Sequence, residues 1–185
     1  MIFNGHSPEK QPNILRKKIE QLINEKLDID KLCVNLDMNS NRLEYVKETN
    51  TIFVKPYSQS NKVGKYYDYQ KFIYQYSHEY VHIYCNNSLA YCHENEIFWI
   101  EEEILCEAMS FLILKEMGEQ LYLNNSIAEY KESLDIGDNR MDKYLQHLKR
   151  RRSSPKVTLQ EVLDLYQSEY DLIKRIKSMR EKESA

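Results

Sequence analysis

Residues 68–85 read DYQKFIYQYSHEYVHIYC, and this stretch predicts the central element of the fold. Its apolar side chains recur at helical spacing, which predicts one helix over the whole stretch; they are Phe72, Ile73, Tyr76, Tyr80, Val81 and Ile83. The helix contains His78-Glu79-Tyr80-Val81-His82, an H-E-x-x-H motif. Because residues i and i+4 of a helix share a face, His78 and His82 can each present a nitrogen to one zinc ion. Glu79 can reach a water molecule on that ion without binding the ion itself.

A second predicted helix, over residues 97–117, supplies acidic side chains. A catalytic zinc site needs a third protein ligand and leaves one position for water. Glu103 follows His82 by 21 residues, which fits a helix end, a loop and the first turns of an antiparallel neighbour. Glu107 lies on the same face and can orient a histidine that binds the metal. We expect Glu103 as the third ligand because, among residues 101–103, only Glu103 has an acid four residues later; Glu102 and Glu107 remain alternatives.

This pairing of motif and acidic helix resembles the gluzincin zinc metallopeptidases, the thermolysin-like group. In that group the helix after the motif carries a glutamate ligand, and an acid four residues later supports the first histidine. The resemblance covers roughly residues 68–115. It implies Zn²⁺ as cofactor and assigns five residues: His78, His82 and Glu103 as ligands, Glu107 as a support, and Glu79 as general base. The pair Glu107-Ala108 is also similar to the phage-repressor-cleaving ImmA/IrrE metallopeptidases, which would move the ligand to Glu107.

Two further parts of a peptidase site can be placed on the sequence. The oxyanion of the tetrahedral intermediate needs a donor besides the metal, and gluzincins use a tyrosine or a histidine. We expect His93 in this role; the other candidate rings are Tyr91, Tyr144 and His147. Such enzymes commonly pair their substrate with a sheet edge, and residues 51–54 are the expected edge because they precede the motif helix.

The remaining chain predicts an α+β fold that is mainly helical. Residues 13–27 form an amphipathic helix, residues 32–38 alternate like a strand, and residues 43–46 and 51–54 bracket a hairpin turn. Residues 57–66 are expected to form a loop. Further helices are expected over 121–134, over 139–151, and from a capping box at Thr158 and Glu161 to about residue 180.

We expect one zincin-like domain over residues 1–185. It divides into a helix with a small N-terminal antiparallel sheet (13–56), the two site helices (66–118) and C-terminal helices (121–185).

Composition narrows the classes of function. A net charge of −3 argues against a dedicated nucleic-acid binder, and the basic run Lys149–Arg152 is expected to be a solvated helix end. No stretch is as long as an apolar membrane span, and the first residues do not resemble a signal peptide. The four cysteines form no C-x-x-C pair, which fits reduced thiols in the cytoplasm. Cys85 and Cys106 are expected to be small buried apolar side chains.

These features predict a small cytoplasmic zinc metallopeptidase that acts on a protein or peptide substrate, without nucleic-acid or membrane partners. A regulatory protein partner is a further hypothesis. The alternatives are a catalytically inactive helical interaction module, from a toxin–antitoxin or phage-related pair, and a zinc hydrolase of a non-peptide bond.

Overall fold

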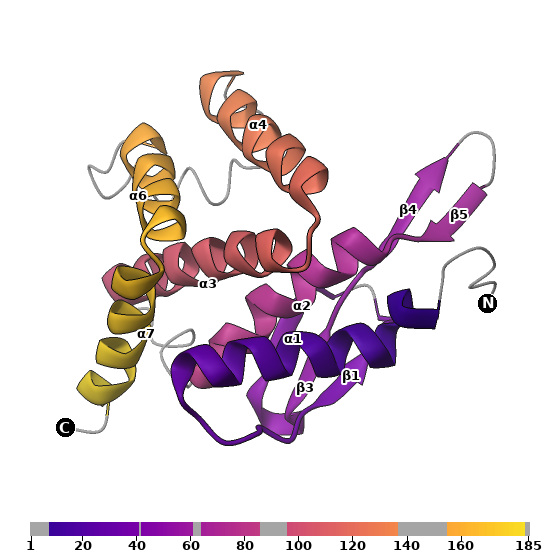
Figure 1. Cartoon of the computed structure of the whole chain (residues 1–185), viewed down its shortest axis with the longest axis horizontal. Helices are drawn as coiled ribbons and strands as arrows, with labels where there is room; N and C mark the ends of the chain where they lie inside the picture. Colours follow the sequence, from indigo (N-terminus) through magenta and orange to yellow (C-terminus); the bar gives the residue numbers. More distant parts are fainter. Residues whose placement is uncertain (1–7, 41, 61–63, 86–95, 137–154, 184–185) are drawn as a thin grey trace.

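The structure is a computed structural model that describes residues 8–40, 42–60, 64–85, 96–136 and 155–183. Over these residues the chain forms six α-helices and two small sheets, so the predicted, mainly helical α+β class is confirmed (Figure 1). The helices are α1 (Pro12–Leu27), α2 (Tyr69–Tyr84), α3 (Glu96–Glu116), α4 (Gln120–Ile136), α6 (Pro155–Gln167) and α7 (Glu169–Glu183). The strands are β1 (Asn35–Asp37), β2 (Glu44–Val46), β3 (Thr51–Phe53), β4 (Tyr57–Ser60) and β5 (Gly64–Tyr67).

The three-stranded sheet is mixed, not antiparallel throughout. β2 and β3 form the predicted hairpin, in which Tyr45 pairs with Ile52. β1 pairs with β3 in parallel, with Leu36 opposite Ile52, so the predicted antiparallel arrangement is wrong at this strand. Alternation along a strand shows which face is buried and not which partner the strand meets.

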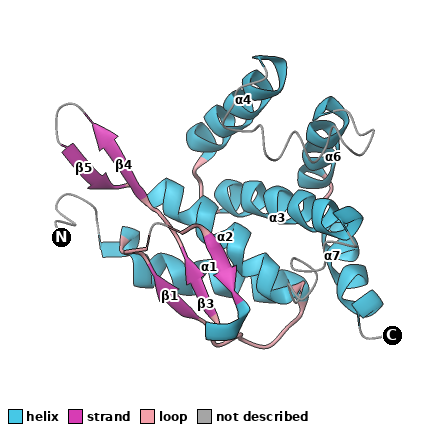
Figure 2. Ribbon diagram, turned by 180° about the vertical axis from the view of Figure 1, so that it is seen from behind, coloured by secondary structure: helices cyan, strands magenta, loops and turns pink. Residues whose placement is uncertain are grey.

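The strand order β1-β3-β2 places β3 in the middle of this sheet. The prediction that residues 51–54 form the substrate-binding edge is therefore wrong, because β3 has a partner on each side. The edges are β1 and β2, and β2 is the edge that contacts α2. Figure 2 shows the sheet in front of α1 and α2, so both helices lie on the same side of it.

The predicted loop over residues 57–66 instead contributes to a second antiparallel pair, β4 and β5. Tyr57 lies opposite Tyr67, and the Lys65 ammonium lies 4.8 Å from the ring centroid of Tyr57. Gly64 starts β5 with a φ of +72°, a backbone conformation that favours glycine. The two strands were not predicted because period-2 alternation is recognised by apolar residues on one face, and β4 and β5 are largely polar.

Buried polar contacts hold α1 against α2. The hydroxyl of Tyr76 donates to Glu20 Oε1 at 2.7 Å, and that of Tyr80 donates to Asn24 Oδ1 at 3.0 Å. Arg16 Nε lies 2.7 Å from the same Glu20 oxygen. These five side-chain oxygen and nitrogen atoms are thus hydrogen-bonded within this helix pair, as buried polar groups require.

Helix α3 runs through the centre of the molecule, where α1, α2, α4, α6 and α7 all contact it (Figure 1). A helix that neighbours surround is apolar on most of its sides, and nine apolar side chains in the described part of α3 are buried: Ile104, Leu105, Cys106, Ala108, Met109, Phe111, Leu112, Ile113 and Leu114. The helix ends before Gly118 as predicted, with that glycine at a φ of +80°.

The C-terminal segment forms two helices and not the single predicted one. α6 begins at Pro155, ahead of the capping box expected at Thr158 and Glu161. Ser168 separates α6 from α7, and its hydroxyl donates to Asp171 Oδ2 at 2.6 Å. Serine is a preferred residue at helix starts, which accounts for the start of a new helix here. The helix predicted over 139–151 and the basic run Lys149–Arg152 lie outside the described residues.

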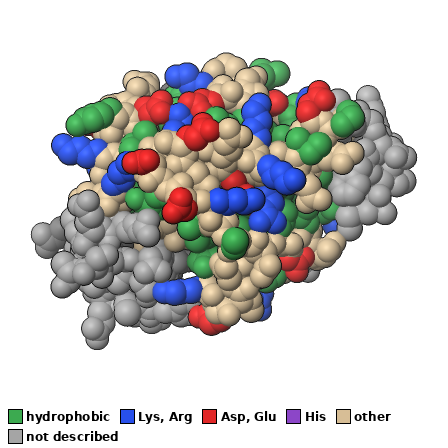
Figure 3. All heavy atoms as spheres, turned by 60° about the horizontal axis from the view of Figure 1, so that its bottom comes forward, with side chains coloured by type: hydrophobic (Ala, Val, Ile, Leu, Met, Phe, Trp, Pro, Cys, Tyr) green, Lys and Arg blue, Asp and Glu red, His purple; other side chains and the backbone are tan. Residues whose placement is uncertain are grey.

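None of the helices within the described ranges is long and apolar enough to cross a membrane. On the face drawn in Figure 3, acidic and basic side chains lie side by side.

Candidate metal centre

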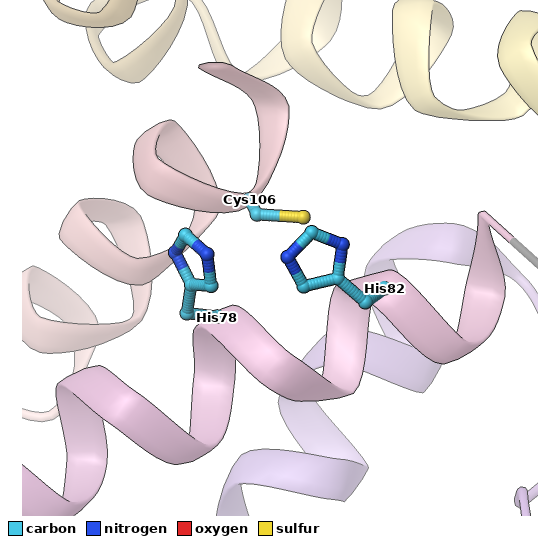
Figure 4. Close-up of side chains that lie close together, drawn as sticks. All are labelled: His78, His82 and Cys106. Carbon is cyan, nitrogen blue, oxygen red and sulfur yellow. The ribbon is translucent and has the colours of Figure 1, made fainter. Parts of the chain in front are cut away.

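The two histidines of the motif lie on the face of α2 that is turned toward α3. Asp68 caps the start of α2 by accepting the backbone N–H of the third helical residue at 3.0 Å. His78 and His82 are one turn apart on one face, whereas Tyr76 and Tyr80, two residues earlier and so about 200° away, face α1. Figure 4 shows both imidazoles directed to the same side.

The carboxylate of Glu103, from α3, lies between the two imidazoles. Glu103 Oε2 is 3.2 Å from His78 Nε2, and Glu103 Oε1 is 3.4 Å from His82 Nε2. The side chains of His78, His82 and Glu103 are only 17%, 8% and 18% exposed. The structure thus brings together the three residues that the sequence analysis expected to meet.

A second carboxylate lies beside the Nδ1 atom of each histidine. Glu102 Oε1 is 2.6 Å from His82 Nδ1, and Glu107 Oε2 is 3.4 Å from His78 Nδ1, without the geometry of a hydrogen bond. The hydroxyl of Tyr74 holds Glu107 by contacts of 2.7 and 2.6 Å to its two oxygens. Carboxylates at Nδ1 orient imidazoles so that Nε2 can bind a metal. Glu102, an alternative ligand in the sequence analysis, contacts Nδ1 and not Nε2.

Glu79 is buried beside the histidines, with 6% of its surface exposed. Burial raises the pKa of Glu79, and the neighbouring His78 and His82 offset this only in part. The backbone N–H of Tyr45, in the edge strand β2, also faces this carboxylate and favours its ionised form. The site therefore holds a carboxylate of raised basicity between the histidines and a sheet edge.

Cys106, from α3, forms a metal-capable group with the two histidines, and this group does not include Glu103. The Sγ of Cys106 and one nitrogen each from His78 and His82 all lie within 4.8 Å of one another, so these three buried or partly buried side chains could hold a metal ion (Figure 4). Cys106 forms no disulfide and is fully buried. Burial raises the pKa of its thiol well above the ordinary value. The burial of Cys106 was expected from the sequence, but its place at the site was not. The spacing of three residues from Glu103, which puts both on one helix face, was the signal that could have indicated it.

The charges of the site favour a cation. Burial alone would lower the pKa of His78 and of His82, but the carboxylates beside them outweigh burial and raise both pKa values well above the ordinary value. Burial favours the neutral form of Glu103, yet the two histidines hold its pKa far below its usual range. Without a metal, protons on the imidazoles supply the positive charge that the ionised Glu103 beside them requires.

The distances from Glu103 to the two imidazoles are close to those between neighbouring ligands of one zinc ion. Nitrogen and oxygen atoms bound to zinc at about 2.0–2.1 Å in a tetrahedron lie about 3.4 Å apart. Glu103 Oε2 lies 3.2 Å from His78 Nε2 and Glu103 Oε1 lies 3.4 Å from His82 Nε2, so each distance is close to that separation but each involves a different oxygen. Imidazole, carboxylate and thiolate are also the ligand types that zinc accepts.

The other expected site residues, His93, Tyr91, Tyr144 and His147, lie outside the described residues. Comparisons of the chain with protein-family models, with curated proteins and with solved structures find no match. Any functional assignment therefore rests on the chemistry of the site.

Proposed function

We propose that the protein is a zinc-dependent metallopeptidase. The observation that carries this proposal is the position of the Glu103 carboxylate, 3.2 and 3.4 Å from the Nε2 atoms of His78 and His82 in an H-E-x-x-H motif. Three protein ligands of these types are the set found in catalytic zinc sites, which keep one position for water or substrate. The buried Glu79 beside them is the group that a purely structural metal site does not need.

The roles of the residues follow from their positions. His78, His82 and Glu103 would hold the zinc ion, while Glu102 and Glu107 orient the imidazoles from their Nδ1 side. Zinc supplies Lewis acidity, which polarises a carbonyl group and lowers the pKa of water. Glu79 accepts the proton of the attacking water on a carboxylate oxygen and delivers it to the nitrogen of the leaving amine. Its raised pKa suits both transfers, because the same group must accept and then release a proton.

An extended peptide is the substrate that the surroundings of Glu79 favour. β2 is an edge strand, and the backbone of its Tyr45 faces the Glu79 carboxylate. A peptide that pairs with the free side of β2 as an added strand would run close to the proposed base. In this proposal the substrate would pair with β2, in place of the edge expected from the sequence.

Replacing the proposed base tests the proposal. Glu79→Gln keeps the shape of the side chain but removes its ability to accept a proton, so we expect unchanged zinc content and a loss of cleavage of roughly 100-fold or more. Zinc content is measured by elemental analysis, and cleavage by mass spectrometry on a pool of unstructured peptides. The exposed Glu48→Gln is the matched control and should behave like the unmodified protein. Cleavage by Glu79→Gln at the rate of the unmodified protein would contradict the assigned base.

A helical interaction module with a structural metal ion is the second candidate. The thiol of Cys106 within the metal-capable group favours it, because closed sites with four protein ligands are typically structural. One tightly bound zinc per chain, together with no cleavage of any peptide in the pool, would favour this candidate over the peptidase.

A further inference from the structure

The thiol of Cys106 has no part in the hydrolytic mechanism, yet it lies within 4.8 Å of a nitrogen of His78 and of His82. A catalytic site with three protein ligands does not require it. We propose that Cys106 is a fourth protein ligand of the metal, in addition to His78, His82 and Glu103. This inference rests on the metal site of the proposed function, and not on the peptidase activity.

Helix geometry places Cys106 and Glu103 on the same face of α3. The two residues are three positions apart on α3, so they lie one turn apart on one face. Figure 4 shows the Cys106 side chain reaching from α3 toward the imidazoles of α2. In a tetrahedron with zinc–sulfur bonds of about 2.3 Å and zinc–nitrogen bonds of about 2.0–2.1 Å, sulfur and nitrogen are about 3.6 Å apart. Because the sulfur lies at most 4.8 Å from each nitrogen, each sulfur–nitrogen distance exceeds that separation by at most about 1.2 Å.

Coordination would change the chemistry of the thiol and of the site. A bound metal ion deprotonates a coordinating thiol; the S–H bond breaks, the electron pair stays on sulfur to form the metal–sulfur bond, and the proton passes to solvent. Four protein ligands make a closed site, so water reaches the metal only when the thiolate leaves. A soft thiolate also makes the site prefer zinc, cobalt or cadmium over magnesium or manganese. Cys106 thereby holds the site in a resting state and restricts the choice of metal.

Cobalt substitution tests this ligand directly. The protein is loaded with Co²⁺ in place of zinc, and its near-ultraviolet spectrum is recorded. We expect a thiolate-to-cobalt charge-transfer band that Cys106→Ser loses and Cys85→Ser keeps; Cys85 is also fully buried but does not belong to the metal-capable group. Zinc affinity of Cys106→Ser should fall roughly tenfold or more, since even groups that only orient a ligand contribute that much. An unmodified protein without the band, or a Cys106→Ser protein that retains it, overturns the proposal.

If circular dichroism shows that Cys106→Ser does not fold, X-ray absorption at the zinc edge tests the same ligand in a protein that keeps Cys106. A variant with Cys33, Cys85 and Cys92 all replaced by serine keeps Cys106 as its sole thiol. Its zinc spectrum should show one sulfur neighbour at about 2.3 Å; a spectrum with only nitrogen and oxygen neighbours overturns the proposal. If this triple variant does not fold, the unmodified protein is measured, and the absence of sulfur has the same meaning. A sulfur ligand without peptide cleavage refutes the peptidase alone, and cleavage without a sulfur ligand refutes this inference alone.

Discussion

At the scale of single residues, three consecutive glutamates of α3 meet three different partners. Glu101 pairs with Arg175 of α7 at 3.2 Å, Glu102 with His82 Nδ1 at 2.6 Å, and Glu103 lies between the two Nε2 atoms. Successive helical residues are turned by about 100°, so only one of the three can face the point between the imidazoles. This geometry supports Glu103 as the ligand and Glu102 as a positioning residue.

Replacing each of the three by glutamine should separate these roles. Glu103→Gln exchanges a carboxylate ligand for a poor neutral one, so we expect zinc binding to be lost at concentrations that saturate the unmodified protein. Glu102→Gln should weaken zinc binding by roughly 10- to 100-fold, because it loosens the orientation of His82. Glu101→Gln is the control and should leave affinity unchanged. Competition with a chromophoric chelator measures all three, and a larger loss in Glu102→Gln than in Glu103→Gln would exchange the two assignments.

Residue spacing predicts which side chains share a face of one helix, but it does not predict how that helix is rotated against its neighbour. Spacing within one helix placed His78 with His82 and Glu103 with Glu107, because i and i+4 residues share a face wherever the helix packs. Spacing also offered Cys106 on the face of Glu103, whereas the contact of Glu102 with Nδ1 depends on how α3 is rotated relative to α2. Packing on the other faces of α3 sets that rotation, for example at the buried Phe111, and no local pattern reports it.

At the scale of elements, α2 is held in place on two opposite faces. One face donates tyrosine hydroxyls to Glu20 and Asn24 of α1, and the other carries the histidines toward α3. Glu20 is only 2% exposed, so it depends on protein donors for its hydrogen bonds. The contact with α1 therefore fixes the position of the histidine face.

Removing one of these hydroxyls should destabilise the fold. Tyr76→Phe takes a donor from the buried Glu20 carboxylate, which we expect to lower the free energy of unfolding by about 1–3 kcal/mol. Urea denaturation followed by circular dichroism measures this change. Tyr170→Phe removes the same hydroxyl at a residue that is 73% exposed, and should have no effect within error. Equal stability of the two variants would show that the contact with Glu20 contributes nothing to the packing of α1 on α2.

The long helices could be predicted from the sequence more closely than the short strands. The helices α1, α2, α3 and α4 occur within two residues of the predicted bounds, because their apolar periods are local and extend over several turns. Strands of three or four residues contain too few alternations to show their partners, so the parallel pairing of β1 and the β4–β5 ribbon were missed. The break at Ser168 was missed because apolar spacing continues across it.

At the scale of the whole molecule, the metal site and the core share their two main helices. α3 supplies Glu103 to the site, and its Leu105 and Met109 are part of the core. α2 supplies the two histidines and packs against both α3 and α1. A metal ion that binds only the folded arrangement stabilises the whole protein by mass action. Zinc at 100 times its dissociation constant would add about 2.7 kcal/mol to the free energy of unfolding, so metal removal should lower the melting temperature.

The pH dependence of this stabilisation has a definite sign. The pKa values of His78 and His82 are raised in the metal-free fold, so their contribution to its stability is fully present below the ordinary histidine pKa of about 6.5 and is lost as the pH rises through the raised values. Zinc must displace these protons, so its affinity changes in the opposite direction and rises with pH. We expect calorimetric titrations in buffers of different ionisation enthalpy to show proton release on zinc binding, and the gain in melting temperature from zinc to shrink as the pH is lowered toward about 6. Glu103→Gln is the control, because the loss of one ligand should make its zinc-dependent gain smaller than that of the unmodified protein at every pH. Zinc binding without proton release would mean that the two imidazoles are not the groups that receive the metal.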